Sequence, residues 1–171
     1  MKRSPHAKHI GAAATFLYAG DFQCAACRAW VSANPLLSGV QNRNHCPFCL
    51  SSRHVDLHHA GDRLCACKAI MQPIGLTTKK KHDKYAPEGN GELMLIHQCR
   101  ACGSFSLNRI AADDDPQALY QVFLQSANLP ADVQWQLAHQ HIQLLRMEDK
   151  ARLRARLFGM TPQPLASLAA A

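Results

Sequence analysis

Apolar residues fall in short runs up to about residue 115 and at helical spacing beyond it. The clearest run is ELMLIHQC at residues 92–99, with apolar side chains at each of positions 93–96. A continuous run of this length is typical of a buried strand. Between residues 22 and 115 the other apolar runs are broken by Cys, Pro, Asn and Gly, which predicts small loops and short strands.

Two helices are predicted after these strands. Asp115 followed by Pro116 is a favourable helix start, and this helix is expected to continue to Ser126. Asp132 is expected to cap a second, longer helix that runs to Phe158 and ends before a glycine.

The predicted long helix carries two different surfaces. Apolar side chains recur at three- and four-residue steps at Trp135, Ala138, Ile142 and Leu145. Beyond them the helix is basic, with Arg146, Lys150 and Arg154 stacked in one column. We therefore expect an apolar face that packs on the protein's own core or on a partner, followed by a cationic end.

The eight cysteines follow a spacing that predicts metal binding. Three CxxC pairs and one CxC pair account for all of them, at Cys24/Cys27, Cys46/Cys49, Cys99/Cys102 and Cys65/Cys67. A CxxC turn directs both sulfurs to one tetrahedral centre, about 2.3 Å from each. Disulfide frameworks have no need of this repeat, so we expect reduced thiolates bound to zinc.

The order of the pairs predicts two zinc ions. The first two CxxC pairs suit one zinc ribbon, and the other four cysteines would form the second site. The CxC bite of Cys65 and Cys67 is less common, so a histidine could replace one of these two ligands. The candidate histidines are His54, His58, His59 and His97. Either ligand set would fill all four coordination positions of the zinc ion, so the site would be structural.

The net charge of +7, with histidine neutral, favours polyanionic partners and above all nucleic acid. Residues 75–91 are predicted to form a mobile basic loop that contains Lys79, Lys80 and Lys81. Residues 1–21 contain a single acid at their end and are expected to form a basic arm. No apolar run is long enough to span a bilayer, and we expect a cytoplasmic protein that does not contact membrane.

The pentapeptide RNHCP at residues 43–47 lies within a series of motifs that is similar to a known family, the bacterial RNHCP-domain proteins. The matching stretches, in order, are FQCAAC, RNHCPFCLSSRHVD, GDR, Cys67 followed by Met71, IHQCRACG and NRIAADDD. The resemblance covers about residues 22–115 and implies a double zinc-binding module inside the cell.

This resemblance also bears on individual residues. It implies that Cys67 is a regular ligand and that Cys65 is not, so that His54 or His97 would take the place of Cys65. Arg28 stands where the family has a small residue, often glycine, which implies a slightly different turn after the first knuckle.

These features together predict a small α+β protein in three parts. A basic N-terminal arm at 1–21 precedes a zinc-ribbon-like double zinc module with short β-strands at 22–115. A C-terminal α-helical extension follows at 116–171.

The favoured functional hypothesis is a non-catalytic protein that binds RNA, with the ribosome as the expected context. Basic side chains beside the knuckles, in the loop and on the long helix would contact the nucleic acid. They are Arg43, Arg63, Lys79, Lys80, Lys81, Arg146, Lys150 and Arg154. Asn44 and His45 are expected to support the metal ligands through hydrogen bonds.

Two alternatives remain open from the sequence. A zinc-dependent hydrolase or nuclease would use His45 or His54 as general base, with residues 113–115 holding a second metal. A protein adaptor would instead bind its partner through Trp135, Ile142 and Leu145 of the helical extension.

Overall fold

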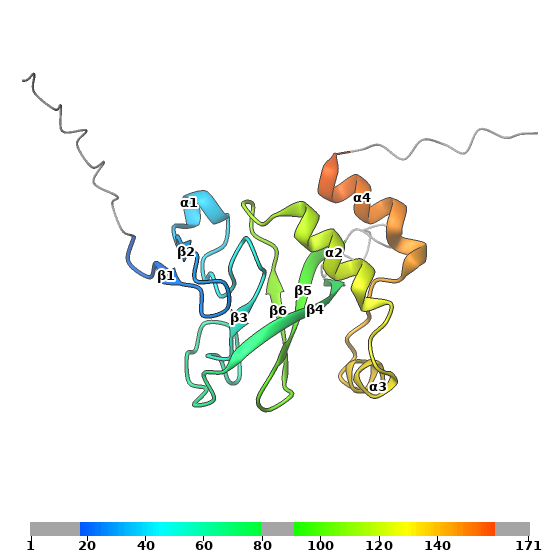
Figure 1. The fold of residues 1–171 in the computed structure, drawn as a ribbon, viewed down its shortest axis with the longest axis horizontal. Coiled ribbons are helices and arrows are strands. Elements are labelled where there is room, and N and C mark those ends of the chain that lie inside the picture. The colour runs from blue at the N-terminus through cyan, green and yellow to red at the C-terminus, as the bar shows by residue number, and fades with distance from the viewer. Residues whose placement is uncertain (1–17, 80–90, 160–171) are drawn as a thin grey trace, which may run out of the picture.

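The computed structural model describes residues 18–79 and 91–159. The elements in chain order are β1 (Phe22–Gln23), β2 (Trp30–Val31), α1 (Pro35–Ser38), β3 (Ser52–Arg53), β4 (Ile70–Lys79), β5 (Glu92–Cys99), β6 (Phe105–Arg109), α2 (Pro116–Ser126), α3 (Ala131–His139), the 3₁₀ turn η1 (Met147–Asp149) and α4 (Lys150–Phe158). Strands β1 and β2 pair with each other, and β3-β4-β5-β6 form one antiparallel sheet in that order (Figure 1). The chain is therefore a small α+β protein, as predicted.

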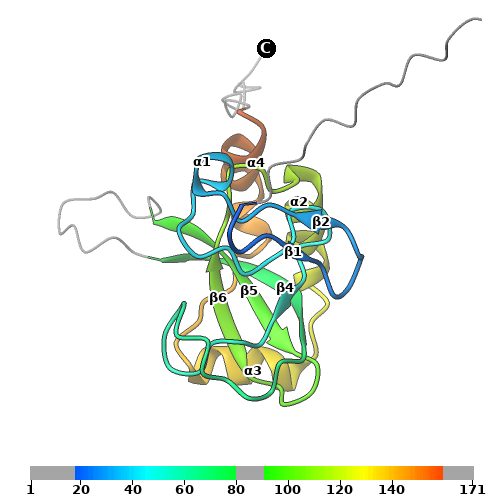
Figure 2. The same cartoon turned by 90° about the vertical axis from the view of Figure 1, so that its left-hand side faces the viewer.

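The four-stranded sheet separates two layers. Helices α2, α3 and α4 lie on one side of it, and the loops before residue 70, with β1, β2 and α1, lie on the other (Figures 1 and 2). Strand β5 is flanked by partners on both edges, and its residues 93–97 are buried. The run ELMLIHQC is thus a central strand because it is apolar on both faces.

Strand β4 contains an irregularity that fits the helical layer. Its register with β5 shifts between Pro73 and Gly75, since proline cannot donate to the ladder. The segment after α3 packs over Gly75, where an added Cβ atom would lie 2.5 Å from Leu144 Cδ2 and the Leu144 side chain would have to move. That segment is held there by the Leu145 N–H, which donates to the Leu76 carbonyl at 2.8 Å.

This strand corrects one prediction. Residues 75–79, expected in a mobile loop, belong to β4, because Leu76 and Thr77 are buried and the segment pairs with β5. The rest of the predicted loop, with Lys80 and Lys81, lies outside the described residues, as do residues 1–17 of the predicted arm.

The first helix begins where the sequence places it, and the second does not continue as expected. The Asp115 carboxylate accepts a hydrogen bond from the Gln117 N–H at 2.8 Å, which caps α2. The predicted helix from 132 to 158 is wrong: α3 ends at His139, and His141 adopts a left-handed φ of 58°. The chain then passes β4 before α4 starts, and the Leu145 N–H bonds to that strand.

The helices pack on the sheet through two apolar clusters, one with α2 and α4 and the other with α3. Leu76 and Leu95 of the sheet pack with Leu119 and Phe123 of α2 and with Leu153 of α4. The residues predicted to form one apolar face are therefore divided. Trp135 is 67% exposed on α3, whereas Leu145 is buried in the core. No helix among the described residues has the length and apolar character that a membrane crossing requires.

Substitution of Leu95 by alanine tests the central strand. The side chain is fully buried, so the cavity left behind should lower the free energy of unfolding by about 2–5 kcal/mol. Denaturant titration at fixed free zinc would measure this change. Leu36→Ala is the matched control, because Leu36 is 93% exposed and should change stability by less than about 0.5 kcal/mol. Equal effects of the two substitutions would contradict the assigned core.

Candidate metal centres

The first metal centre is built from the first two CxxC pairs. Cys24, Cys27, Cys46 and Cys49 place their sulfurs within 4.8 Å of one another. The Cys24–Cys49 and the Cys27–Cys46 sulfur separations are each 3.6 Å. Tetrahedral zinc with bonds of about 2.3 Å separates its sulfur ligands by about 3.8 Å, so this group could hold one zinc ion.

Local backbone bonds shape this first centre. The Arg28 N–H donates to the Cys24 carbonyl at 3.0 Å, and the Leu50 N–H donates to the Cys46 carbonyl at 2.9 Å. Burial raises the pKa of the Cys46 thiol to about 12. A thiol in such a place is ionised only when a cation balances the thiolate, which is the chemistry that a bound zinc supplies.

The second metal centre has three cysteines and one histidine. His54, Cys67, Cys99 and Cys102 form the group, which could hold the second zinc ion as a closed Cys₃His site. The Cys67 sulfur lies 3.7 Å from that of Cys99 and 4.0 Å from that of Cys102. His54 Nδ1 lies 3.2 Å from the Cys102 sulfur. The Ser104 hydroxyl lies 3.3 Å from the same sulfur and lowers the pKa of Cys102 to about 6.

Cys65, predicted as a ligand, lies outside both groups. It is 4% exposed, and its N–H donates to the Val55 carbonyl at 2.9 Å. The Lys68 N–H donates to the His54 carbonyl at 3.1 Å, so the two segments run side by side. This pairing is what brings His54 to Cys67, in agreement with the alternative that replaces Cys65 by a histidine.

His97, the other candidate replacement, has a structural position instead. It is fully buried; its Nε2 lies 2.6 Å from the Leu50 carbonyl, and its Nδ1 accepts from the Asn108 amide at 2.9 Å. Burial lowers the pKa of His97 to about 3, so the ring is neutral. His58 and His59 are exposed and are not in either ligand group.

A left-handed residue follows each ligand turn. Arg28 has a φ of 67°, Leu50 of 58°, Lys68 of 53° and Gly103 of 73°, and each comes directly after a cysteine ligand. Arg28 therefore has the same backbone conformation as the glycine of the third knuckle. The different turn expected after the first knuckle is not found at this residue.

Arg43 belongs to a buried ion pair. Its side chain is 0% exposed, and one terminal nitrogen donates to both carboxylate oxygens of Asp113 at 2.8 and 2.7 Å. The other terminal nitrogen donates to Asp114 at 3.3 Å, and Nε donates to the His45 carbonyl at 3.1 Å. This corrects the expected contact with nucleic acid, because the guanidinium is enclosed and its charge is balanced.

Asn44 and His45 fix the same region without contacting the sulfurs. His45 Nε2 lies 2.8 Å from Asp114 Oδ2, and the Asn44 amide donates to Asp56 Oδ2 at 2.9 Å. The hydrolase hypothesis needs other positions. His45 is 1% exposed, His54 is in a ligand group, and residues 113–115 are used by Arg43 and by the cap of α2.

The remaining predicted cations are dispersed. Arg63, Lys79, Arg146 and Arg154 are exposed and Lys150 is half-buried. The Arg63 carbonyl accepts from Nζ of Lys68, the residue after the ligand Cys67, whereas α4 lies on the other side of the sheet from the loops before residue 70 (Figure 1). Three exposed cations near the second centre were missed, namely Arg53, Lys68 and Arg100. Their signal was present in the sequence, since each lies directly beside a ligand of the second centre.

Comparison with known proteins gives one match. A family model described as the RNHCP domain matches residues 19–120, which is more than half of the chain. No curated protein and no solved structure matches the chain.

Substitution of His54 and of Cys65 separates the two ligand sets. His54→Ala should weaken the second zinc by more than about 100-fold, because a direct ligand is lost. Zinc content after a chelator challenge should then fall to about one ion per chain. Cys65→Ser is the control and should retain both ions. Loss of zinc from Cys65→Ser together with its retention in His54→Ala would contradict this ligand set.

The buried His97 predicts a pH dependence. Its pKa is about 3 in the folded chain against 6.5 for the ordinary group, so unfolding takes up a proton below pH 6.5. Stability should therefore fall as the pH decreases from 6.5 toward 3. Between pH 7.5 and 5.5 the loss from this group is about 1.4 kcal/mol. Denaturant titrations at saturating zinc should show that loss in the wild type and not in His97→Gln, and equal losses would contradict it.

Proposed function

The chain belongs to the RNHCP domain family, and we propose that its two-zinc module binds RNA, with ribosomal RNA as the partner. The observation that carries the proposal is a group of four exposed cations around the second metal centre. They are Arg53, Arg63, Lys68 and Arg100, and we call them the basic group. Cations held around a rigid centre suit contact with a phosphate backbone.

Hydrogen bonds connect the members of the basic group. Arg53 Nε donates to the Lys68 carbonyl at 3.3 Å, and Lys68 Nζ donates to the Arg63 carbonyl at 3.2 Å. The Arg100 N–H donates to the carbonyl of Ile70, the residue paired with Arg53 across β3 and β4. The four residues therefore form one local surface although they span residues 53–100 in the sequence.

The acids of this region point inward. Asp62 accepts hydrogen bonds from the N–H groups of Leu57 and His58 at 2.9 and 2.8 Å. These backbone bonds, that from Leu57 first, hold the pKa of Asp62 well below its usual value. Asp56 likewise accepts from the Gly61 N–H at 2.9 Å. Asp56 Oδ1 also lies 3.9 Å from Arg63 Nε, whereas Arg53, Lys68 and Arg100 have no ion pair within the described part of the chain. These three cations therefore dominate the outer surface.

The ligand set of the second centre also favours an anionic partner. Three thiolates and a neutral histidine around Zn²⁺ leave one formal negative charge, whereas the four thiolates of the first centre leave two. The second centre therefore reduces the positive potential of the basic group less than a four-thiolate centre would. We propose a binding role without catalysis in the cytoplasm, where the thiolates stay reduced.

Charge removal within the basic group tests the proposal. Arg53→Gln, Lys68→Gln and Arg100→Gln together should weaken binding to single-stranded RNA. The log–log slope of affinity against salt should decrease in magnitude by about 2, near 0.7 for each phosphate that the variant no longer neutralises. Fluorescence anisotropy with a labelled oligonucleotide would measure both quantities. Arg152→Gln is the control, since Arg152 pairs with Asp149 on α4.

Zinc content must be equal in the variants, so that unfolding of the module is not mistaken for weaker RNA binding. Unchanged affinity and slope in the triple variant would contradict the proposal. Co-sedimentation with ribosomes, abolished by a high-salt wash and weakened in the triple variant, tests the ribosomal context. RNA binding without ribosome association would assign the surface to another RNA.

A further inference from the structure

We propose that the cavity beside Asn44 and His45 binds one unstacked nucleotide of the RNA, with guanine as its base. This inference rests on the proposed RNA binding and specifies what is recognised. The cavity has a volume of about 330 Å³, at the small end of the range of ligand pockets. Val40, Met94 and Leu107 contribute apolar walls, which suit a flat base.

Two buried acceptors at this cavity have no partner within the described part of the chain. They are Nδ1 of His45 and Oδ1 of Asn44. Both residues line the cavity, and His45 is 1% exposed. Buried polar atoms are nearly always hydrogen-bonded, so two unpaired atoms on residues that line one cavity point to a ligand that donates.

The other polar atom of each side chain is already committed. His45 Nε2 faces Asp114 Oδ2 at 2.8 Å, and this carboxylate also accepts from the Ala111 N–H. In the neutral ring Nε2 therefore carries the proton, and Nδ1 is left as an acceptor. The Asn44 amide nitrogen donates to Asp56, which leaves Asn44 Oδ1 as the second acceptor. Neither side chain can rotate to offer a donor without losing its bond to Asp56 or to Asp114.

A ligand that pairs with both acceptors presents two N–H donors. Guanine does so with N1–H and the neighbouring amino group on its Watson–Crick edge. Uracil offers only one ring N–H between two carbonyl oxygens. Proteins read single-stranded RNA by binding such edges of unstacked bases. The exposed cation Lys79 lines the same cavity and supplies a partner for the phosphate. Arg109 also lines it, with its Nε 3.2 Å from Glu92 Oε1.

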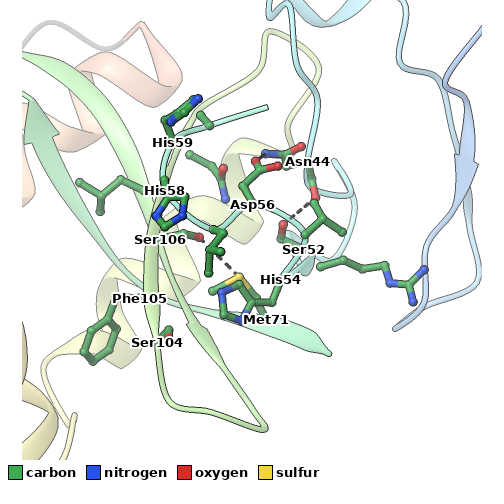
Figure 3. Close-up of a pocket in the computed structure, with 16 residues that line it drawn as sticks. Asn44, Ser52, His54, Asp56, His58, His59, Met71, Ser104, Phe105 and Ser106 are labelled. Carbon is green, nitrogen blue, oxygen red and sulfur yellow. Dashed lines mark hydrogen bonds between the residues drawn. The ribbon is translucent and has the colours of Figure 1, made fainter. Parts of the chain in front are cut away.

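A second cavity connects this site with the basic group. It has a volume of about 310 Å³ and is lined by Asn44 and His54, which Figure 3 shows on its wall. The two cavities share Asn44, Ala60, Leu107 and Asn108, so they adjoin. Arg53 of the basic group lines the second cavity as well. A strand of RNA bound to the basic group could therefore place its next nucleotide beside His45.

Titration of the zinc-loaded full chain with GMP and with UMP tests the inference. In protein with ¹⁵N-labelled histidine, GMP should shift the Nδ1 resonance of His45. The affinity for UMP should be at least about tenfold lower than that for GMP, because one acceptor stays unpaired. Ala60→Trp should abolish the GMP shift, since this exposed residue lines both cavities and its indole would fill them. Ala60→Ser is the control and should bind GMP as the wild type does.

The outcomes distinguish this inference from the proposed function. Salt-sensitive RNA binding through the basic group, with no GMP shift at His45, would overturn the nucleotide site and leave RNA binding standing. Water would then satisfy the two acceptors. A GMP shift without RNA binding would support the nucleotide site and overturn the proposed function. Equal affinity for GMP and UMP would overturn the assignment of guanine.

Discussion

The guanidinium of Arg43 lies between the carboxylates of Asp113 and Asp114 and joins parts of the chain that are about 70 residues apart. Neither charge is accessible at the Arg43–Asp114 contact, where both side chains are 0% exposed. A buried charge without its partner is strongly destabilising. Burial of the Arg43 segment is therefore favourable only when the segment of Asp113 and Asp114 is in place. Two backbone bonds close the same junction, from Ala112 to Ser38 and from Asp115 to Pro47. The ion pair thus ties the first metal centre to the start of α2.

Metal ligation stabilises the remainder of the layer formed by the loops before residue 70. The buried apolar cluster of this layer consists of Cys24, Val31 and Cys46, far smaller than the core between the sheet and the helices. A layer with so little apolar burial needs another source of stability. Structural zinc supplies about 10–16 kcal/mol of apparent binding free energy. Zinc at the second centre would stabilise the far end of the sheet in the same way, where the turn after β5 meets His54 and Cys67.

Sequence reasoning succeeded where the signal was local. The run at residues 92–99 was predicted as a strand because its apolar character is continuous, and the start of α2 was predicted from Asp115 and Pro116. The CxxC turns are local in the same sense. Arg43 was misassigned because its burial is set by residues about 70 positions away. The segment after the break at His141 likewise bonds to a distant strand through Leu145, and the choice of His54 over Cys65 depends on the pairing of residues 54–55 with residues 65–69.

The left-handed residues after the ligand turns have a consequence for how the sequence can vary. For a residue with a Cβ atom this conformation costs about 1–2 kcal/mol, which is small beside the free energy of the metal bonds that impose it. Glycine is therefore not required at these positions, and Arg28, Leu50 and Lys68 occupy three of them. Each position stands next to a metal ligand and accepts cationic or apolar side chains alike. The metal centres hold the backbone in one conformation there, so the side chains beside each ion can change in sequence while the fold stays the same.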